Sequence, residues 1–143
     1  MAGTQPKLYV LPGSHPCVAV EKALEMKSIG YERVILLPMT QMLVGPLRYG
    51  GTTVPGMRID GERLVGSRAI MRRLDELASE PPLLPPVGDP AYARVLEAER
   101  WGDEQLQSVP RRILDVAWLR RPQAMESYAG DTCLLYTSPS PRD

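Results

Sequence analysis

The chain has 143 residues, 43% of them hydrophobic, and its 17 basic and 17 acidic residues give a formal net charge of zero at pH 7. This length predicts one ordinary domain, or one domain with part of another, and the balanced charge leaves no electrostatic footprint for nucleic acid or an anionic membrane. No apolar run approaches the roughly 18 residues of a spanning helix, no secretory h-region is present, and two distant cysteines make no disulfide framework, so we expect a cytoplasmic protein with no membrane or nucleic-acid partner.

The first part of the chain predicts a strand, a helix and a second strand. An apolar strand over Lys7–Leu11 is followed by a helix over about His15–Ser28, with Gly30 as the residue just past the helix end. The second strand, Glu32–Leu37, carries an unbroken apolar run and is predicted to be buried on both faces. A crossover of this length predicts parallel pairing of the two strands.

A loop with one irregular helical turn is predicted for residues 38–52, and a hairpin and a third element follow it. Pro55 begins a strand, Asp60-Gly61 is typical of a type I′ turn, and Ser67 is the predicted N-cap of a helix. One face of that helix is apolar and carries Ile70, Leu74 and Leu77. The order βαβ–ββα predicts an α/β fold with a four-stranded mixed sheet over residues 1–78.

Residues 79–90 are rich in proline and predict a semi-rigid linker, and residues 91–132 predict the incomplete start of an all-helical domain. Asp89-Pro90 has the pattern of an N-cap followed by a first-turn proline, and the helix should reach about Val109, where Pro110 ends or kinks it. A further helix should run from about Arg111 to Leu119. Apolar residues of these helices that absent helices would bury should be partly exposed: Trp101, Leu106, Ile113, Leu114 and Trp118.

The sequence of residues 133–143 permits codons that match a common transposase-library adaptor over all eleven positions. A natural Ser/Pro-rich disordered tail is the alternative interpretation. We expect an adaptor-derived tail, with the natural sequence ending near Thr132, and leave the tail out of fold reasoning. Cys133 then belongs to no biological site.

A proline-led strand, a tight turn, a second strand and a serine-led helix follow one another between Thr53 and Ile70. With Val54-Pro55 and Ser67 at these places, the segment resembles the glutathione site of the glutathione S-transferase family. The resemblance implies a thioredoxin-like domain and a cis Val54–Pro55 bond, with the backbone before the proline pairing with the cysteinyl part of glutathione. Ser67 would hold the γ-glutamyl end, and Gly66, where the family usually has an acidic or amide residue, weakens one contact. The implied glutathione-binding residues are Thr53, Val54, Pro55, Gly66 and Ser67.

Ser14-His15-Pro16-Cys17 follows the first strand and opens the first helix, where free amides and a partial positive charge favour an anion. The spacing resembles the S-x-x-C site of the family, which makes Ser14 the candidate catalytic hydroxyl that stabilises a thiolate; the alternative is a cap or turn residue. Cys17 is either a secondary redox thiol or, as we favour, a small buried hydrophobe. His15 could tune the thiolate, but a solvated residue is favoured, and no set of metal ligands accompanies it.

The resemblance covers about residues 7–109 and implies a glutathione transferase-like, detoxifying enzyme that uses glutathione to attack a small electrophile, without a metal. A glutathione-dependent isomerase and a non-catalytic interaction module with the same fold are the alternatives. The full-length parent is expected to be a homodimer, and the chain as given is expected to be inactive, because the family builds its electrophile pocket largely from the helical domain.

Overall fold

The computed structural model describes residues 5–121 and 123, which form two compact units divided between Leu84 and Pro85. The tail at 133–143 lies outside the described residues. A four-stranded sheet with the strand order β2-β1-β3-β4 organises the first unit. Its strands are β1 (Lys7–Val10), β2 (Glu32–Ile35), β3 (Gly56–Ile59) and β4 (Glu62–Val65).

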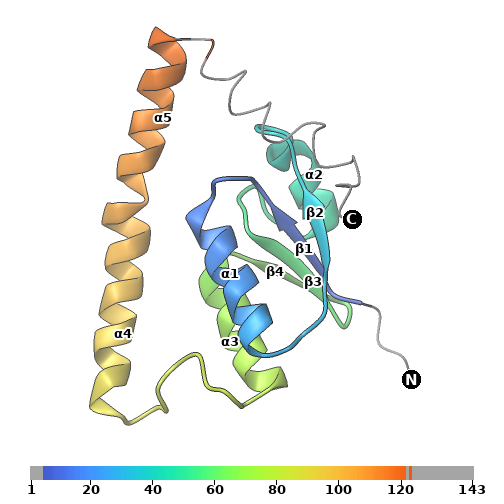
Figure 1. Ribbon diagram of the computed structural model, residues 1–143, viewed down its shortest axis with the longest axis vertical. Helices are drawn as coiled ribbons and strands as arrows, with labels where there is room; N and C mark the ends of the chain where they lie inside the picture. Colours follow the sequence, from blue (N-terminus) through green and yellow to red (C-terminus); the bar gives the residue numbers. More distant parts are fainter. Residues whose placement is uncertain (1–4, 122, 124–143) are drawn as a thin grey trace, which may run out of the picture. The chain divides into compact units, whose positions relative to one another are not determined.

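Strand directions and helix placement confirm the predicted βαβ–ββα order. β1 runs parallel to β2 and antiparallel to β3, which is antiparallel to β4, so the sheet is mixed. The helices of this unit are α1 (His15–Met26), α2 (Gln41–Arg48) and α3 (Ser67–Leu77). α1 and α3 lie side by side on one face of the sheet, and α2 belongs to the other face (Figure 1).

The main core lies between the sheet and the helices α1 and α3. Leu8 and Val10 alternate along β1 toward this face, as a period of two residues requires, and α1 contributes Val20 and Leu24 at helical spacing. Each of these side chains is fully buried. The buried members of this cluster are Leu8, Val10, Cys17, Val20, Ala23, Leu24, Met57, Ile59, Ile70 and Leu74.

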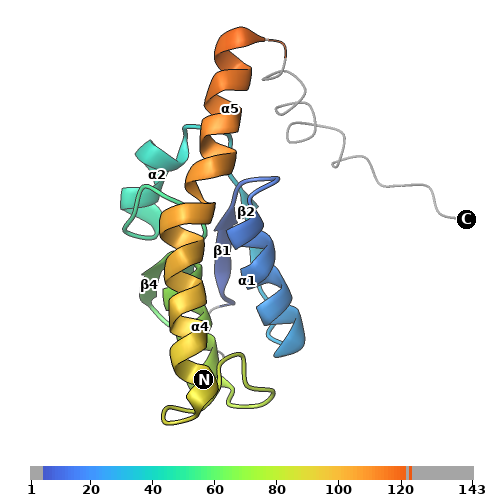
Figure 2. The ribbon, with the colours of Figure 1, turned by 90° about the vertical axis from the view of Figure 1, so that its left-hand side faces the viewer.

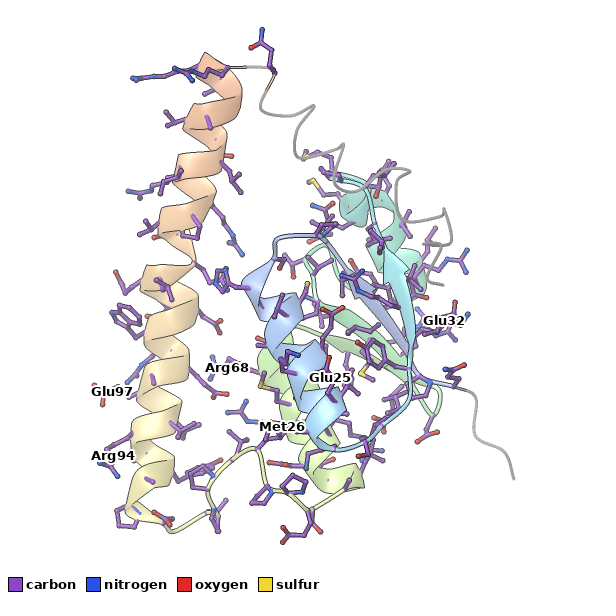
Figure 3. All side chains as sticks on the ribbon, viewed as in Figure 1. Glu25, Met26, Glu32, Arg68, Arg94 and Glu97 are labelled. Carbon is purple, nitrogen blue, oxygen red and sulfur yellow. The ribbon has the colours of Figure 1, made fainter. Side chains whose placement is uncertain are left out.

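The opposite face of the sheet carries two rows of side chains that follow from the strand register. The first row is small or apolar and consists of Val34, Tyr9, Gly56 and Val65. The second row is charged and consists of Glu32, Lys7, Arg58 and Arg63. Tyr49, at the end of α2, packs with Tyr9 and Leu36 over the first row. The charged row is left partly exposed, with Glu32 on β2 at the edge of the sheet (Figure 3).

Two predictions in the β2–α2 region were wrong. β2 ends at Ile35 and is an edge strand with most of its residues exposed, Ile35 by 45%, so its apolar run does not mark burial on both faces. Residues 41–48 form α2 in place of a loop with one turn, and they do so with Pro46 inside the helix. Pro46 is past the first turn of α2, so the helix forms without the bond that an N–H at this position would donate to the carbonyl of Met42.

The hairpin prediction is confirmed, whereas the predicted boundaries of α1 and α3 shift by a residue or two. Asp60 and Gly61 connect β3 to β4 with φ of 48° and 84°, as a type I′ turn requires. The N-cap of α3 is Gly66, at φ 85°, and Ser67 is the first helical residue. At the end of α1 the residue with positive φ is Ser28, at 53°, and the predicted Gly30 is two residues too late.

A buried ion pair fastens the start of the proline-rich segment to the first unit. Lys27, whose side chain is fully buried, lies 2.7 Å from the carboxylate of Asp75. Lys27 also donates to the carbonyl oxygens of Ala78 and Pro81, and Asp75 accepts from the backbone N–H groups of Leu83 and Leu84. These bonds explain why the first unit extends to Leu84.

The second unit is helical, with α4 (Pro90–Trp101), the π-helical turn η1 (Gly102–Leu106) and α5 (Ser108–Arg120) following one another in a nearly continuous rod (Figure 2). The Asp89 cap is confirmed, because its side chain accepts from the Ala91 N–H at 2.7 Å. A single helix to Val109 was wrong: the regular helix ends at Trp101, and Pro110 lies in the first turn of α5, where its missing N–H costs nothing. Arg94 and Glu97 project from one side of α4 (Figure 3).

Several apolar side chains of the second unit are exposed, as the sequence predicts. Trp101 is 57% exposed and Ile113 is 64% exposed, and Leu106 and Leu114 are also exposed. The side chain of Trp118 lies outside what the structure describes. Within residues 5–121 and 123, no helix is both long and apolar enough to cross a bilayer.

Candidate functional site

The strand register brings the predicted site segments to one edge of the sheet. Tyr9 near the end of β1 pairs with Gly56 at the start of β3, and Gly56 pairs with Val65 at the end of β4. The chain therefore leaves β1, enters β3 and leaves β4 at the same edge. α1 begins just after β1, and α3 begins just after β4, so both helices point their N-termini to this edge. Free N–H groups and partial positive charge gather there, which favours an anion.

The Val54–Pro55 peptide bond at this edge is cis. Pro55 is fully buried, Val54 is half-buried against both side-chain clusters, and Thr53 is exposed. The carbonyl oxygen of Pro55 accepts a hydrogen bond of 2.8 Å from the N–H of Gly66. This bond links the proline segment directly to the entrance of α3.

Gly66 and Ser67 form that entrance. Gly66 has φ 85° and ψ 149°, a conformation that glycine adopts without the steric cost that a Cβ carries. Ser67 is the first residue of the helix and is half-buried. An added Cβ at Gly66 would meet no atom within 4 Å, which leaves open space beside Ser67.

Ser14 is the N-cap residue of α1, but its side chain forms no capping bond. Its carbonyl oxygen instead accepts from the N–H groups of Cys17 and Val18 at 3.0 and 3.1 Å. Its side chain lies near enough to the Cys17 thiol to lower the pKa of that thiol. His15, the next residue, is exposed.

Cys17 is 2% exposed and belongs to the main core. Burial raises the pKa of its thiol, and the hydrogen bond with Ser14, which acts in the opposite direction, does not offset that effect. The thiol is therefore neutral at pH 7, which fits the favoured interpretation of Cys17 as a small core hydrophobe. In the part of the chain that the structure describes, no group of three or more His, Cys, Asp or Glu residues is placed to bind a metal ion.

Sequence reasoning missed Tyr49, a fully buried residue next to the proline segment. A signal was present in the sequence, because Tyr49 is a large residue among the glycines 45, 50, 51 and 56. Glycines close to a bulky aromatic residue are typical of places where a backbone approaches a ring closely.

A family model for the N-terminal domain of glutathione S-transferases matches residues 8–82. The chain belongs to the glutathione S-transferase family. The match covers the sheet except Lys7, the three helices of the first unit and all the predicted site residues. No curated protein matches the chain.

Solved glutathione S-transferases and an isomerase have similar folds. A glutathione transferase homologue from Sulfitobacter with bound glutathione has a TM-score of 0.64 and 20% identity over 90% of this chain and 63% of its own. A glutathione S-transferase from the Antarctic clam Laternula elliptica has a TM-score of 0.58 and 21% identity over 90% and 64%. A maleylacetoacetate isomerase from Anaeromyxobacter dehalogenans with bound glutathione has a TM-score of 0.60 and 25% identity over 90% and 62%. The chain thus spans less than two thirds of the length of these neighbours.

Proposed function

We propose that this chain is the glutathione-binding part of a glutathione transferase-like enzyme, which activates glutathione as a thiolate for attack on a small electrophile. The observation that carries the proposal is the meeting of Ser14, the cis Val54–Pro55 segment and the Gly66–Ser67 helix entrance at one edge of the sheet. In the proposed arrangement the backbone of Val54 pairs with the cysteinyl part of glutathione. The N-terminus of α3, with Ser67, binds the γ-glutamyl carboxylate.

The proposed chemistry rests on Ser14. Thiolate, and not thiol, is the nucleophile, so the site must favour loss of the glutathione S–H proton at neutral pH. The Ser14 hydroxyl makes no capping bond, so it can turn from Cys17 and donate to the glutathione sulfur. The N-terminus of α1 adds partial positive charge. The thiol proton passes to solvent, and the sulfur lone pair forms a bond to the electrophilic atom as that atom's bond to a leaving group, or its π bond, breaks and takes up the electron pair.

Thiolate absorbance of bound glutathione, followed as the pH is raised, tests this proposal in the full-length parent protein. We expect the pKa of the bound thiol to lie below that of free glutathione, and Ser14→Ala to return it toward the free value with a fall in turnover of about 10²-fold. Ser67→Ala serves as the matched control, because it should weaken binding while leaving the pKa of the bound thiol in place. An unshifted thiol pKa in the wild-type parent would sink the proposal.

A glutathione-dependent isomerase is the second candidate, supported by the likeness to the A. dehalogenans isomerase. The two reactions differ in the fate of glutathione: conjugation consumes it, whereas isomerisation returns it after each turnover. Measuring free thiol during turnover of a candidate substrate separates them. A folded full-length protein that is not retained on a glutathione resin would instead favour a non-catalytic module.

The proposal extends to the setting of the enzyme. We expect a cytoplasmic, detoxifying protein that works as a homodimer in its full-length form, and a 143-residue chain that binds glutathione but has little or no turnover. Gly66 offers no carboxylate for the glutathione amino group, so a different low-molecular-weight thiol is an outcome that a thiol-exchange binding series would reveal.

A further inference from the structure

Tyr49 lies at the C-terminal end of α2 and is fully buried at the centre of the second side-chain cluster. Its ring centroid lies 5.1 Å from that of Tyr9, with the ring planes tilted by 38°. The partly buried side chains packed on the same cluster include Val54 and Val65. Tyr49 is therefore the large residue that joins α2 to the outer face of the sheet.

The ring fills space that glycines leave free. A Cβ atom at Gly56 would lie 2.2 Å from the Tyr49 ring, and a Cβ at Gly45 would lie 2.7 Å from its hydroxyl oxygen. Gly56 is an interior sheet position, flanked by Tyr9 and Val65 in the register. Glycine weakens the interior of a strand, and its presence there is typical of a close approach by another group. Here that group is the Tyr49 ring.

The contact with Gly56 places the ring directly under the proposed thiol-binding backbone. Gly56 follows Pro55, whose carbonyl oxygen is bonded to the N–H of Gly66, and Val54 packs on the same cluster as Tyr49. The ring therefore packs against the sheet at the residue that directly follows the cis proline. The same proline is bonded to the entrance of α3.

The ring and not the hydroxyl carries this contact. The hydroxyl oxygen of Tyr49 is buried and has no hydrogen-bond partner among the described residues. A buried polar group without a partner reduces stability, so the side chain is held there for its shape.

We propose that Tyr49 is a positioning residue for the thiol site, whose ring, seated against Gly56, holds the Val54–Pro55 backbone and its bond to Gly66 in the binding geometry. The expected effect of Tyr49 on glutathione affinity rests on the proposed function. Its expected effect on the backbone at residues 54–56 and 66 rests on the backbone geometry alone. Because misplacement of binding groups by about 1 Å can cost up to about 10²-fold, loss of the ring should be measurable.

The test uses the 143-residue chain and three substitutions: Tyr49→Phe, Tyr49→Leu and Leu36→Ala. Leu36 belongs to the same cluster but follows β2, which β1 separates from β3 and the proline segment, so it is the matched control for a general loss of packing. Glutathione affinity is measured by titration calorimetry. Amide hydrogen exchange is measured at Gly66, which bonds Pro55, and at Ile29, which bonds Leu24 on the far side of the core.

We expect Tyr49→Phe to keep the affinity within about twofold, and Tyr49→Leu to weaken it by about tenfold or more. In Tyr49→Leu, exchange at Gly66 should quicken more than exchange at Ile29, whereas Leu36→Ala should quicken both amides in proportion. Equal changes at the two amides in Tyr49→Leu, an unchanged affinity, or a loss in Tyr49→Phe as large as that in Tyr49→Leu would overturn the proposal.

Two further outcomes are distinguishable. If the wild-type chain binds no glutathione, the proposed function fails, while the ratio of exchange at Gly66 and Ile29 still decides whether Tyr49 positions the backbone. If Tyr49→Leu does not fold, Gly56→Ala takes its place, since its new methyl group would displace the ring. That variant should show the same selective loss of protection at Gly66, and equal loss at both amides would overturn the inference.

Discussion

Replacing Asp75 by asparagine should destabilise the first unit strongly, because it leaves the ammonium group of Lys27 buried without a counter-charge. The Lys27 side chain is fully buried, the Asp75 side chain is 21% exposed, and their charged atoms are 2.7 Å apart. Removing one partner of a buried pair costs about 3–5 kcal/mol. Since water reaches part of Asp75, and two carbonyl oxygens still accept from Lys27, we expect about 3 kcal/mol, a large share of the roughly 5–15 kcal/mol that stabilises a domain.

Urea unfolding followed by circular dichroism measures this free energy. The matched control is Lys22→Ala, which breaks the Lys22–Glu25 pair, also at 2.7 Å but between side chains that are 68% and 57% exposed. An exposed pair of this kind contributes little, because water screens the two charges. The double variant Lys27→Met, Asp75→Asn should lose less than the sum of the single losses, because the unpaired charge is gone. Equal losses in Asp75→Asn and Lys22→Ala would refute the reasoning.

The same pair predicts that stability depends on pH. Burial raises the pKa of Asp75, but the bonds from Lys27, Leu83 and Leu84 outweigh burial and hold the pKa below its ordinary value. The stabilisation that the Asp75 carboxylate gives should therefore be full above about pH 4 and disappear as the pH falls through the folded-state pKa. Acid titration of the unfolding free energy checks this, and a slope as steep in Asp75→Asn as in the wild type would contradict it. Gly61→Ala, at φ 84° in the hairpin, should lower the free energy of unfolding by about 1 kcal/mol or more. Gly30→Ala is the control and should lower it by almost nothing, because φ is not positive there and an added Cβ meets nothing within 4 Å. Equal shifts of the melting temperature in the two variants would count against the turn assignment. Burial raises the pKa of the Cys17 thiol. The thiol should therefore react with a thiol reagent at pH 8 only as fast as the first unit opens, and low concentrations of urea should speed labelling in a Cys133→Ser background. Labelling at the rate of a free thiol would disprove the burial.

Local chemistry made the hairpin and the start of α4 predictable. Asp60 and Gly61 both tolerate the positive φ of a type I′ turn. The Asp89 side chain caps α4, and Pro90 has the φ of a first helical residue. In both places the residues themselves favour the structure that forms. The family match over residues 8–82 supports the fold class that these elements indicated.

The errors arose where tertiary packing decides. The apolar run of β2 looks like an interior strand, but its place at the edge of the sheet depends on the order of pairing, which no local pattern gives. Ser67 is a good N-cap by composition, yet Gly66 takes that place because the chain must turn from β4 into α3 through φ 85°. The glycines around Tyr49 were a signal in the sequence, but which of them faces the ring depends on the packing of α2 on the sheet.

The anchoring of Leu83 and Leu84 to Asp75 shortens the tether to whatever follows the first unit. Without the bonds to Asp75, the connection between α3, which ends at Leu77, and α4 would be residues 78–89. With Leu84 bonded to Asp75, the connection is residues 85–89. At roughly 3.3–3.6 Å per residue, its greatest reach falls from about 40 Å to about 17 Å. A shorter tether raises the effective concentration of one unit at the surface of the other. A salt bridge buried far from the proposed thiol site thereby limits the volume that the helical unit can search.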